Sequence, residues 1–60
     1  MPNIIIQQLP KDPEVTRELV RRVTEAVVDA TKAPADKVHV WVQDHQPDHY
    51  AVGGILVADQ

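Results

Sequence analysis

The stretch Val38-His39-Val40-Trp41-Val42-Gln43 alternates strictly, and it decides how the rest of the chain must fold. Side chains of a β-strand point alternately to its two faces, so the three valines share one face of the strand that this pattern predicts. The histidine, the tryptophan and the glutamine share the other face. The valine face needs an apolar partner, which the preceding segment supplies.

That preceding segment, from Pro13 to about Lys32, has the spacing of an amphipathic helix. Asp12 is expected to be its N-cap, with Pro13 at the first helical position, and Pro34 ends the helix soon after Lys32. The apolar residues of the segment form one stripe, made of Val15, Leu19, Val20, Val23, Ala26, Val27 and Ala30. We expect this stripe to pack on the valine face.

A further strand is predicted before the helix, at Ile4-Ile5-Ile6-Gln7-Gln8-Leu9. Three β-branched residues in a row favour a strand, and they predict one that is buried on both faces at its start. Strand, helix and strand in this order form a β-α-β unit, in which the two strands are parallel and the crossover is right-handed. The fold class is therefore α/β (α+β).

The C-terminal part predicts a short β-hairpin. Residues 44–49 are polar, include Pro47 and are typical of a loop. Tyr50-Ala51-Val52 is expected to form a third short strand, Gly53-Gly54 a turn, and Ile55-Leu56-Val57 an apolar segment after it.

Length and composition limit the possible functions. The chain has 60 residues, a net charge of −3 and no cysteine, so we expect one domain over residues 1–60 without disulfides. The acidic balance argues against a nucleic-acid partner, and a ribbon-helix-helix DNA binder would need a helix where Val38–Gln43 alternates. No stretch is apolar enough for a membrane, and no signal peptide is visible, so we expect a cytoplasmic protein.

The predicted fold cannot cover itself. A two-stranded sheet is marginal alone, and domains of this size usually need help from partner subunits. Trp41 points away from the predicted helix, onto a face that one subunit leaves open. Both observations predict a homo-oligomer.

His45 and His49 are four residues apart and follow Asp44 and Asp48 respectively. On a helix this spacing suits a metal, but Pro47 lies between them and no third ligand is evident. We therefore expect no metal site.

Pro2 is the residue that most clearly suggests chemistry. Removal of Met1 would leave the secondary amine of Pro2 as the chain terminus. In an apolar pocket near cations, the protonated form of such an amine is disfavoured, and the neutral amine becomes a general base.

The whole sequence resembles the 4-oxalocrotonate tautomerase family. The resemblance rests on Met1-Pro2 followed at once by a strand, the helix segment Glu18–Val27, Ala33-Pro34, the Val38–Val42 strand, and Asp48-His49-Tyr50-Ala51-Val52-Gly53-Gly54. It implies β-α-β subunits that assemble as oligomers, most often hexamers built as trimers of dimers. It also implies a cofactor-independent isomerase that interconverts the enol and keto forms of a small 2-hydroxy-dienoate or related 2-oxo acid, such as 2-hydroxymuconate.

The same resemblance implies the roles of particular residues. Pro2 matches the amino-terminal proline that acts as general base, and Tyr50 falls where the family has an aromatic residue beside it. Lys11 and His39 stand where the best-studied members have arginines that bind substrate carboxylates, and Trp41 shares the strand face of His39 and could line the pocket. Lysine and histidine lack the planar fork of arginine, so the hold on a second carboxylate should be weaker.

Those two replacements leave other functions open. The scaffold could carry another activity on small acids, such as hydration-dehalogenation or decarboxylation. It could also be a non-catalytic oligomeric scaffold, and Lys11 and His39 are the residues that favour this reading.

Overall fold

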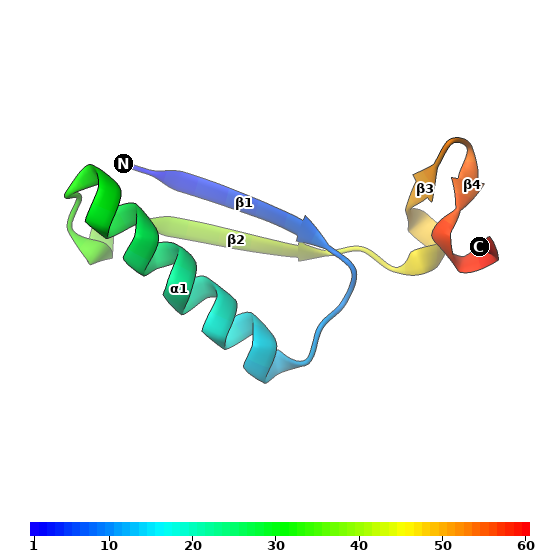
Figure 1. The fold of residues 1–60 in the computed structure, drawn as a ribbon, viewed down its shortest axis with the longest axis horizontal. Coiled ribbons are helices and arrows are strands. Elements are labelled where there is room, and N and C mark those ends of the chain that lie inside the picture. The colour runs from blue at the N-terminus through cyan, green and yellow to red at the C-terminus, as the bar shows by residue number, and fades with distance from the viewer.

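The computed structural model describes all 60 residues, and its body is a β-α-β unit. Strand β1 (Asn3–Gln8), helix α1 (Pro13–Thr31) and strand β2 (His39–Asp44) follow one another, with a 3₁₀ turn at Ala35–Lys37 before β2. The two strands are parallel and in continuous register from Asn3 opposite His39 to Gln8 opposite Asp44. Figure 1 shows α1 running along the two-stranded sheet. The predicted β-α-β order and parallel pairing are confirmed.

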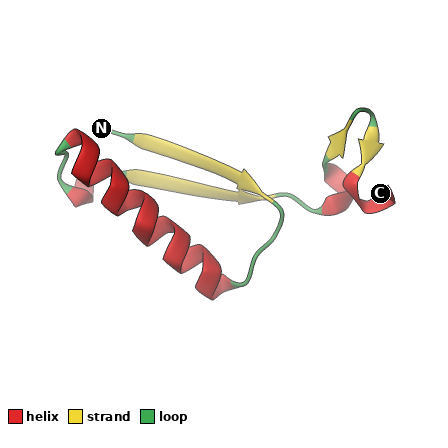
Figure 2. Ribbon diagram, viewed as in Figure 1, coloured by secondary structure: helices red, strands yellow, loops and turns green.

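The C-terminal hairpin is a separate small sheet. Strands β3 (Ala51–Val52) and β4 (Ile55–Leu56) are antiparallel and do not join β1 and β2. Both turn glycines have positive φ, 64° at Gly53 and 84° at Gly54, which glycine adopts without steric cost. The 3₁₀ turns Pro47–His49 and Val57–Asp59 flank the hairpin, and Figures 1 and 2 show it as an arm that extends away from the body.

The helix begins where the sequence predicts it. Asp12 is the N-cap, and its backbone carbonyl accepts the N–H groups of Val15 and Thr16 at 3.0 and 3.1 Å, but its side chain makes no capping hydrogen bond. The helix ends at Thr31. Lys32 lies just beyond it in the left-handed conformation, with φ 63°, and donates its N–H to the carbonyl of Val28 at 2.8 Å.

The face of α1 that contacts the sheet is narrower than the apolar stripe in the sequence. Leu19, Val20, Val23 and Val27 are half-buried, as predicted. The other members of the predicted stripe, Val15, Ala26 and Ala30, are exposed, whereas Val28 is half-buried although the stripe omitted it. Two strands span only part of the width of the stripe, and its edges extend beyond them.

No residue of the subunit is fully buried, because the molecule is thin. Its shortest dimension is 13 Å, which leaves room for a helix and a sheet but no third layer. Ile5 is 62% exposed and its register partner Trp41 is 48% exposed, both on the sheet face away from α1. The prediction that the start of the first strand is buried on both faces is therefore wrong for the isolated subunit, since only one layer covers it. Burial of the second face requires another chain.

The helices do not cross a bilayer: α1 carries charged residues along its length, and none of the helices combines the length and the apolar character needed.

Candidate active site

Pro2 lies at the amino-terminal end of β1. It is half-buried, and its carbonyl accepts the backbone N–H of His39 at 3.0 Å, which extends the parallel ladder by one bond beyond the strand. This bond fixes Pro2 beside the first residue of β2. In a chain that keeps Met1, the Pro2 nitrogen belongs to an amide and is not basic.

His39 and Trp41 lie next to each other on the outer sheet face. Their ring centroids are 5.8 Å apart and the ring planes differ by 26°, so the two rings stack. Both side chains are exposed, because they alternate with the valines that face α1. The subunit therefore presents an imidazole and an indole together near its Pro2 end.

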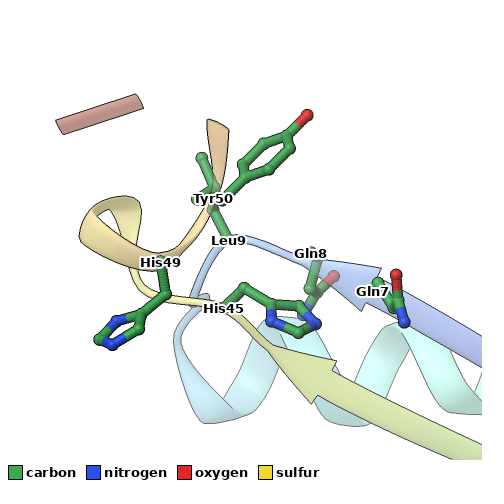
Figure 3. A pocket seen from close by; sticks show the side chains of 6 residues that line it. All are labelled: Gln7, Gln8, Leu9, His45, His49 and Tyr50. Carbon is green, nitrogen blue, oxygen red and sulfur yellow. The ribbon is translucent and has the colours of Figure 1, made fainter. Parts of the chain in front are cut away.

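The larger cavity of the subunit lies at the opposite end of the sheet. It has a volume of about 450 Å³. Its walls come from the end of β1 and from the segment that leads out of β2 (Figure 3), and consist of Gln7, Gln8, Leu9, His45, His49 and Tyr50. The carboxyl ends of parallel strands meet at one edge of a sheet, which is why segments so far apart in sequence form one wall.

Hydrogen bonds fix the positions of several polar residues in the wall of this cavity. The backbone N–H of His45 donates to the carbonyl of Gln8 at 2.7 Å, and the side-chain amide of Gln8 donates to Asp44 Oδ1 at 3.1 Å. His49 Nδ1 lies 2.8 Å from Asp48 Oδ1. Figure 3 shows the hydroxyl of Tyr50 directed away from the two histidines. The wall thus combines four polar side chains with the ring of Tyr50 and Leu9 as its apolar parts.

The residues suggested by the sequence divide between the two ends of the sheet. Pro2 and His39 lie at the amino-terminal end, Trp41 on the outer face near them, and Tyr50 in the cavity at the carboxyl end. Lys11 is exposed in the connection between β1 and α1 and does not line the cavity. The six residues of β1 span about 20 Å at the usual rise of a strand. One subunit therefore does not bring Pro2 and Tyr50 together.

Five residues line this cavity although the sequence did not predict it: Gln7, Gln8, Leu9, His45 and His49. Parallel pairing of the two long strands was the available signal, because it places whatever follows each strand at the same edge.

The side chains with shifted pKa values lie elsewhere, on the surface of α1. Hydrogen bonds from Arg21 and Arg22 lower the pKa of Glu18 from 4.5 to about 2, and the same contact with Glu18 raises the pKa of Arg21. Arg21 also pairs with Glu25 at 2.7 Å. This exposed network includes neither Pro2 nor any residue of the cavity.

No group of three or more His, Cys, Asp or Glu side chains is arranged to hold a metal ion. His45 and His49 share the cavity wall, but His49 is engaged with Asp48.

Comparison with known proteins gives consistent matches over the whole chain. A family model described as "Tautomerase enzyme" matches residues 2–60. The 2-hydroxymuconate tautomerase of Bacillus subtilis is 38% identical over 98% of this chain and 97% of its own. The crystal structure of YwhB, a homologue of 4-oxalocrotonate tautomerase, superposes with a TM-score of 0.92 at 37% identity, over 98% of both chains. A heterohexameric 4-oxalocrotonate tautomerase from Chloroflexus aurantiacus superposes with a TM-score of 0.91 at 32% identity, over 98% of this chain and 97% of that one.

Proposed function

The chain belongs to the tautomerase family, and on this basis we propose that it interconverts the enol and keto forms of a small 2-hydroxy-dienoate or related 2-oxo acid, such as 2-hydroxymuconate. The reaction needs no cofactor in this proposal. The observation that carries it is the extent of the family match, which begins at Pro2 itself and continues to the last residue. The full-length similarity to a 2-hydroxymuconate tautomerase supports the substrate class.

In the proposed mechanism Met1 is removed, and the secondary amine of Pro2 is the general base. The amine takes the proton from the 2-hydroxyl group of the enol, the C2–O bond becomes a carbonyl, and the double bonds shift along the chain. The protonated amine then returns a proton to carbon, so that the base is regenerated and atoms balance. A positioned base of this kind contributes about 10²–10⁴ in rate.

His39 is the residue we propose to stabilise the oxygen that gains negative charge. Its backbone N–H is bonded to the Pro2 carbonyl, so its side chain starts beside the base. A hydrogen-bond donor at this point favours the enolate-like transition state more than the substrate. Trp41, stacked on His39, would hold the imidazole in place and shield it from water.

The complete site is proposed to lie between subunits of a homo-oligomer, a hexamer in the arrangement we favour. Strand β1 pairs on one side only, so its other edge is free for another chain. Two copies of β1 that pair antiparallel about a twofold axis would place Pro2 of one copy beside the carboxyl end of the other. That end carries the cavity with Leu9 and Tyr50. The hexameric relative supports an assembly of this order.

Substrate preference should follow from the missing arginines. Lys11 provides a point charge without a fork, and it lies outside the cavity of its own subunit. We propose that the hold on the second carboxylate of 2-hydroxymuconate is weak. Phenylenolpyruvate, which has a phenyl ring in place of the second double bond and its carboxylate, tests this point.

The test is a steady-state ultraviolet assay of enol-to-keto conversion on both substrates. It uses protein shown by mass spectrometry to begin at Pro2, and matched protein that retains Met1. Turnover above the buffer rate by the first sample alone is the expected result. Equal turnover by both samples, or none by the assembled Pro2-terminated protein, would overturn the proposal.

A further inference from the structure

His45 forms part of the cavity wall but has no assigned role. It follows β2 directly, and the 2.7 Å hydrogen bond from its backbone N–H to the Gln8 carbonyl fixes where its side chain starts. Its imidazole lines the same cavity as Tyr50 and lies beside Gln8 in Figure 3. Its Nε2 atom is buried and has no hydrogen-bond partner.

An unpaired buried nitrogen is unfavourable, and native structures rarely leave one without a reason. The polar neighbours of His45 direct their hydrogen bonds to aspartates instead: Gln8 donates to Asp44, and His49 pairs with Asp48. The partner that Nε2 lacks must therefore come from outside the subunit. The cavity beside the ring is where such a partner would enter.

We propose that His45 is a specificity-determining residue whose Nε2 hydrogen-bonds an oxygen at the end of the substrate that lies away from the Pro2 amine. This inference rests on the proposed function, since it assumes an acid that spans from Pro2 of one subunit to the cavity of another. The ring torsion of histidine is broad, so a small rotation brings Nε2 to the cavity surface. The hydrogen bond then orients the far end of the substrate, since Lys11 does not line this cavity.

The test compares two unreactive acids that differ only at the far end. Muconate is a six-carbon diene with two carboxylates, and sorbate has the same diene with a methyl group in place of the second carboxylate. Dissociation constants for both are measured by calorimetry on the assembled protein. Neither acid carries the 2-hydroxyl group, so the measurement is independent of turnover.

Three variants separate the hydrogen bond from the shape of the side chain. His45→Leu keeps a similar bulk but has no polar atom. His45→Gln keeps a hydrogen-bond donor close to the Nε2 position. His49→Leu is the matched control, because it removes another imidazole of the same wall whose Nδ1 already has Asp48 as partner.

We expect the wild-type protein to prefer muconate over sorbate by about ten- to a hundredfold, the range of one hydrogen bond to a charged group. His45→Leu should abolish the preference, His45→Gln should retain part of it, and His49→Leu should reduce it less than His45→Leu does. Muconate should also shift the ¹⁵N resonance of His45 Nε2.

An unchanged preference in His45→Leu would overturn the inference. So would an Nε2 resonance that responds to protein concentration but not to muconate, because a partner subunit would then occupy the nitrogen. A His45-dependent preference in a protein that shows no tautomerase turnover would uphold the binding role and refute the proposed function, so the two failures are distinguishable.

Discussion

The two ends of the β1–β2 sheet differ in what they offer a substrate. The amino-terminal end has Pro2 and His39, joined by a 3.0 Å backbone hydrogen bond, but the larger cavity is not there. The carboxyl end has that cavity, of about 450 Å³, with Tyr50 and His45 in its wall, but no basic amine. The proposed base and the proposed binding pocket are thus separated by the length of a strand.

This separation means that each end of the subunit provides only half of a proposed site. Another subunit would have to provide the other half. A thin chain with no fully buried residue and a free edge on β1 is suited to pairing with a copy of itself. Antiparallel pairing would join unlike ends, so one contact would cover the free edge of β1 and complete the site.

The largest effect is expected at the amino-terminal end. Pro2→Ala, in protein processed to begin at residue 2, replaces a secondary amine by a primary one with a different basicity and shape. We expect kcat/KM to fall by about 10²–10³ while the oligomer survives. The ultraviolet assay measures the loss and light scattering checks the assembly. Pro34→Ala, a proline exposed before the 3₁₀ turn, is the control; undiminished turnover in Pro2→Ala would contradict the role of the amine.

The next largest effect is expected on the outer face of the sheet, which runs from one end of the strands to the other. Trp41 is 48% exposed in the subunit and should be covered in the assembly. Trp41→Ala is expected to weaken association by about 2 kcal/mol, as for an aromatic residue central to an interface. Sedimentation velocity over a dilution series measures the shift towards smaller species. Asp29→Ala, at an exposed position of α1, is the control and should not shift the oligomer. Unchanged association in Trp41→Ala would show that this face is not an interface.

A smaller effect is expected at the carboxyl end. The Tyr50 hydroxyl points away from the histidines, so the ring rather than the hydroxyl should matter. Tyr50→Phe should change kcat/KM by less than about threefold, whereas Tyr50→Ala removes an apolar wall and should lower it by more than about tenfold. Kinetics of both variants on phenylenolpyruvate decide the point. Equal losses in the two variants would instead assign the role to the hydroxyl.

The smallest effect lies on α1, outside both ends. Arg21 and Arg22 lower the pKa of Glu18 to about 2, so the ionised carboxylate stabilises the fold above its usual pKa of 4.5. This contribution is lost as the pH falls from 4.5 towards 2. Glu18→Gln should therefore melt slightly below the wild-type protein at pH 7, and the difference should vanish near pH 2. Thermal melts across this range test it, and a gap that grows on acidification would have the wrong sign.

The sequence was sufficient for the order of elements. Alternation in Val38–Gln43, the helical stripe and the Gly53-Gly54 turn each depend on local geometry, and each predicted the type of element that forms there. The prediction that the start of β1 is buried on both faces was wrong at Ile5, because burial there depends on a second layer that one chain does not have. Local patterns report which face is apolar, but not which molecule covers it.

The site was harder to predict for the same reason. Pro2 and Tyr50 could be singled out from residue type and from the family resemblance, but their separation follows only from the parallel register of β1 and β2. The cavity lining at Gln8 and His45 arises from two strand ends that meet at one edge. No single segment carries that information, whereas the topology does.

Subunit complementation tests whether Pro2 of one subunit works with the cavity of another. Pro2→Ala is unfolded and refolded together with Leu9→Trp, whose larger side chain is placed in the cavity wall to obstruct binding. If the site lies between subunits, random mixing restores both native halves at about a quarter of the sites, and activity rises well above that of either parent. If each subunit used its own Pro2 and its own cavity, the mixture would show only the mean of the two parents, which would contradict the account.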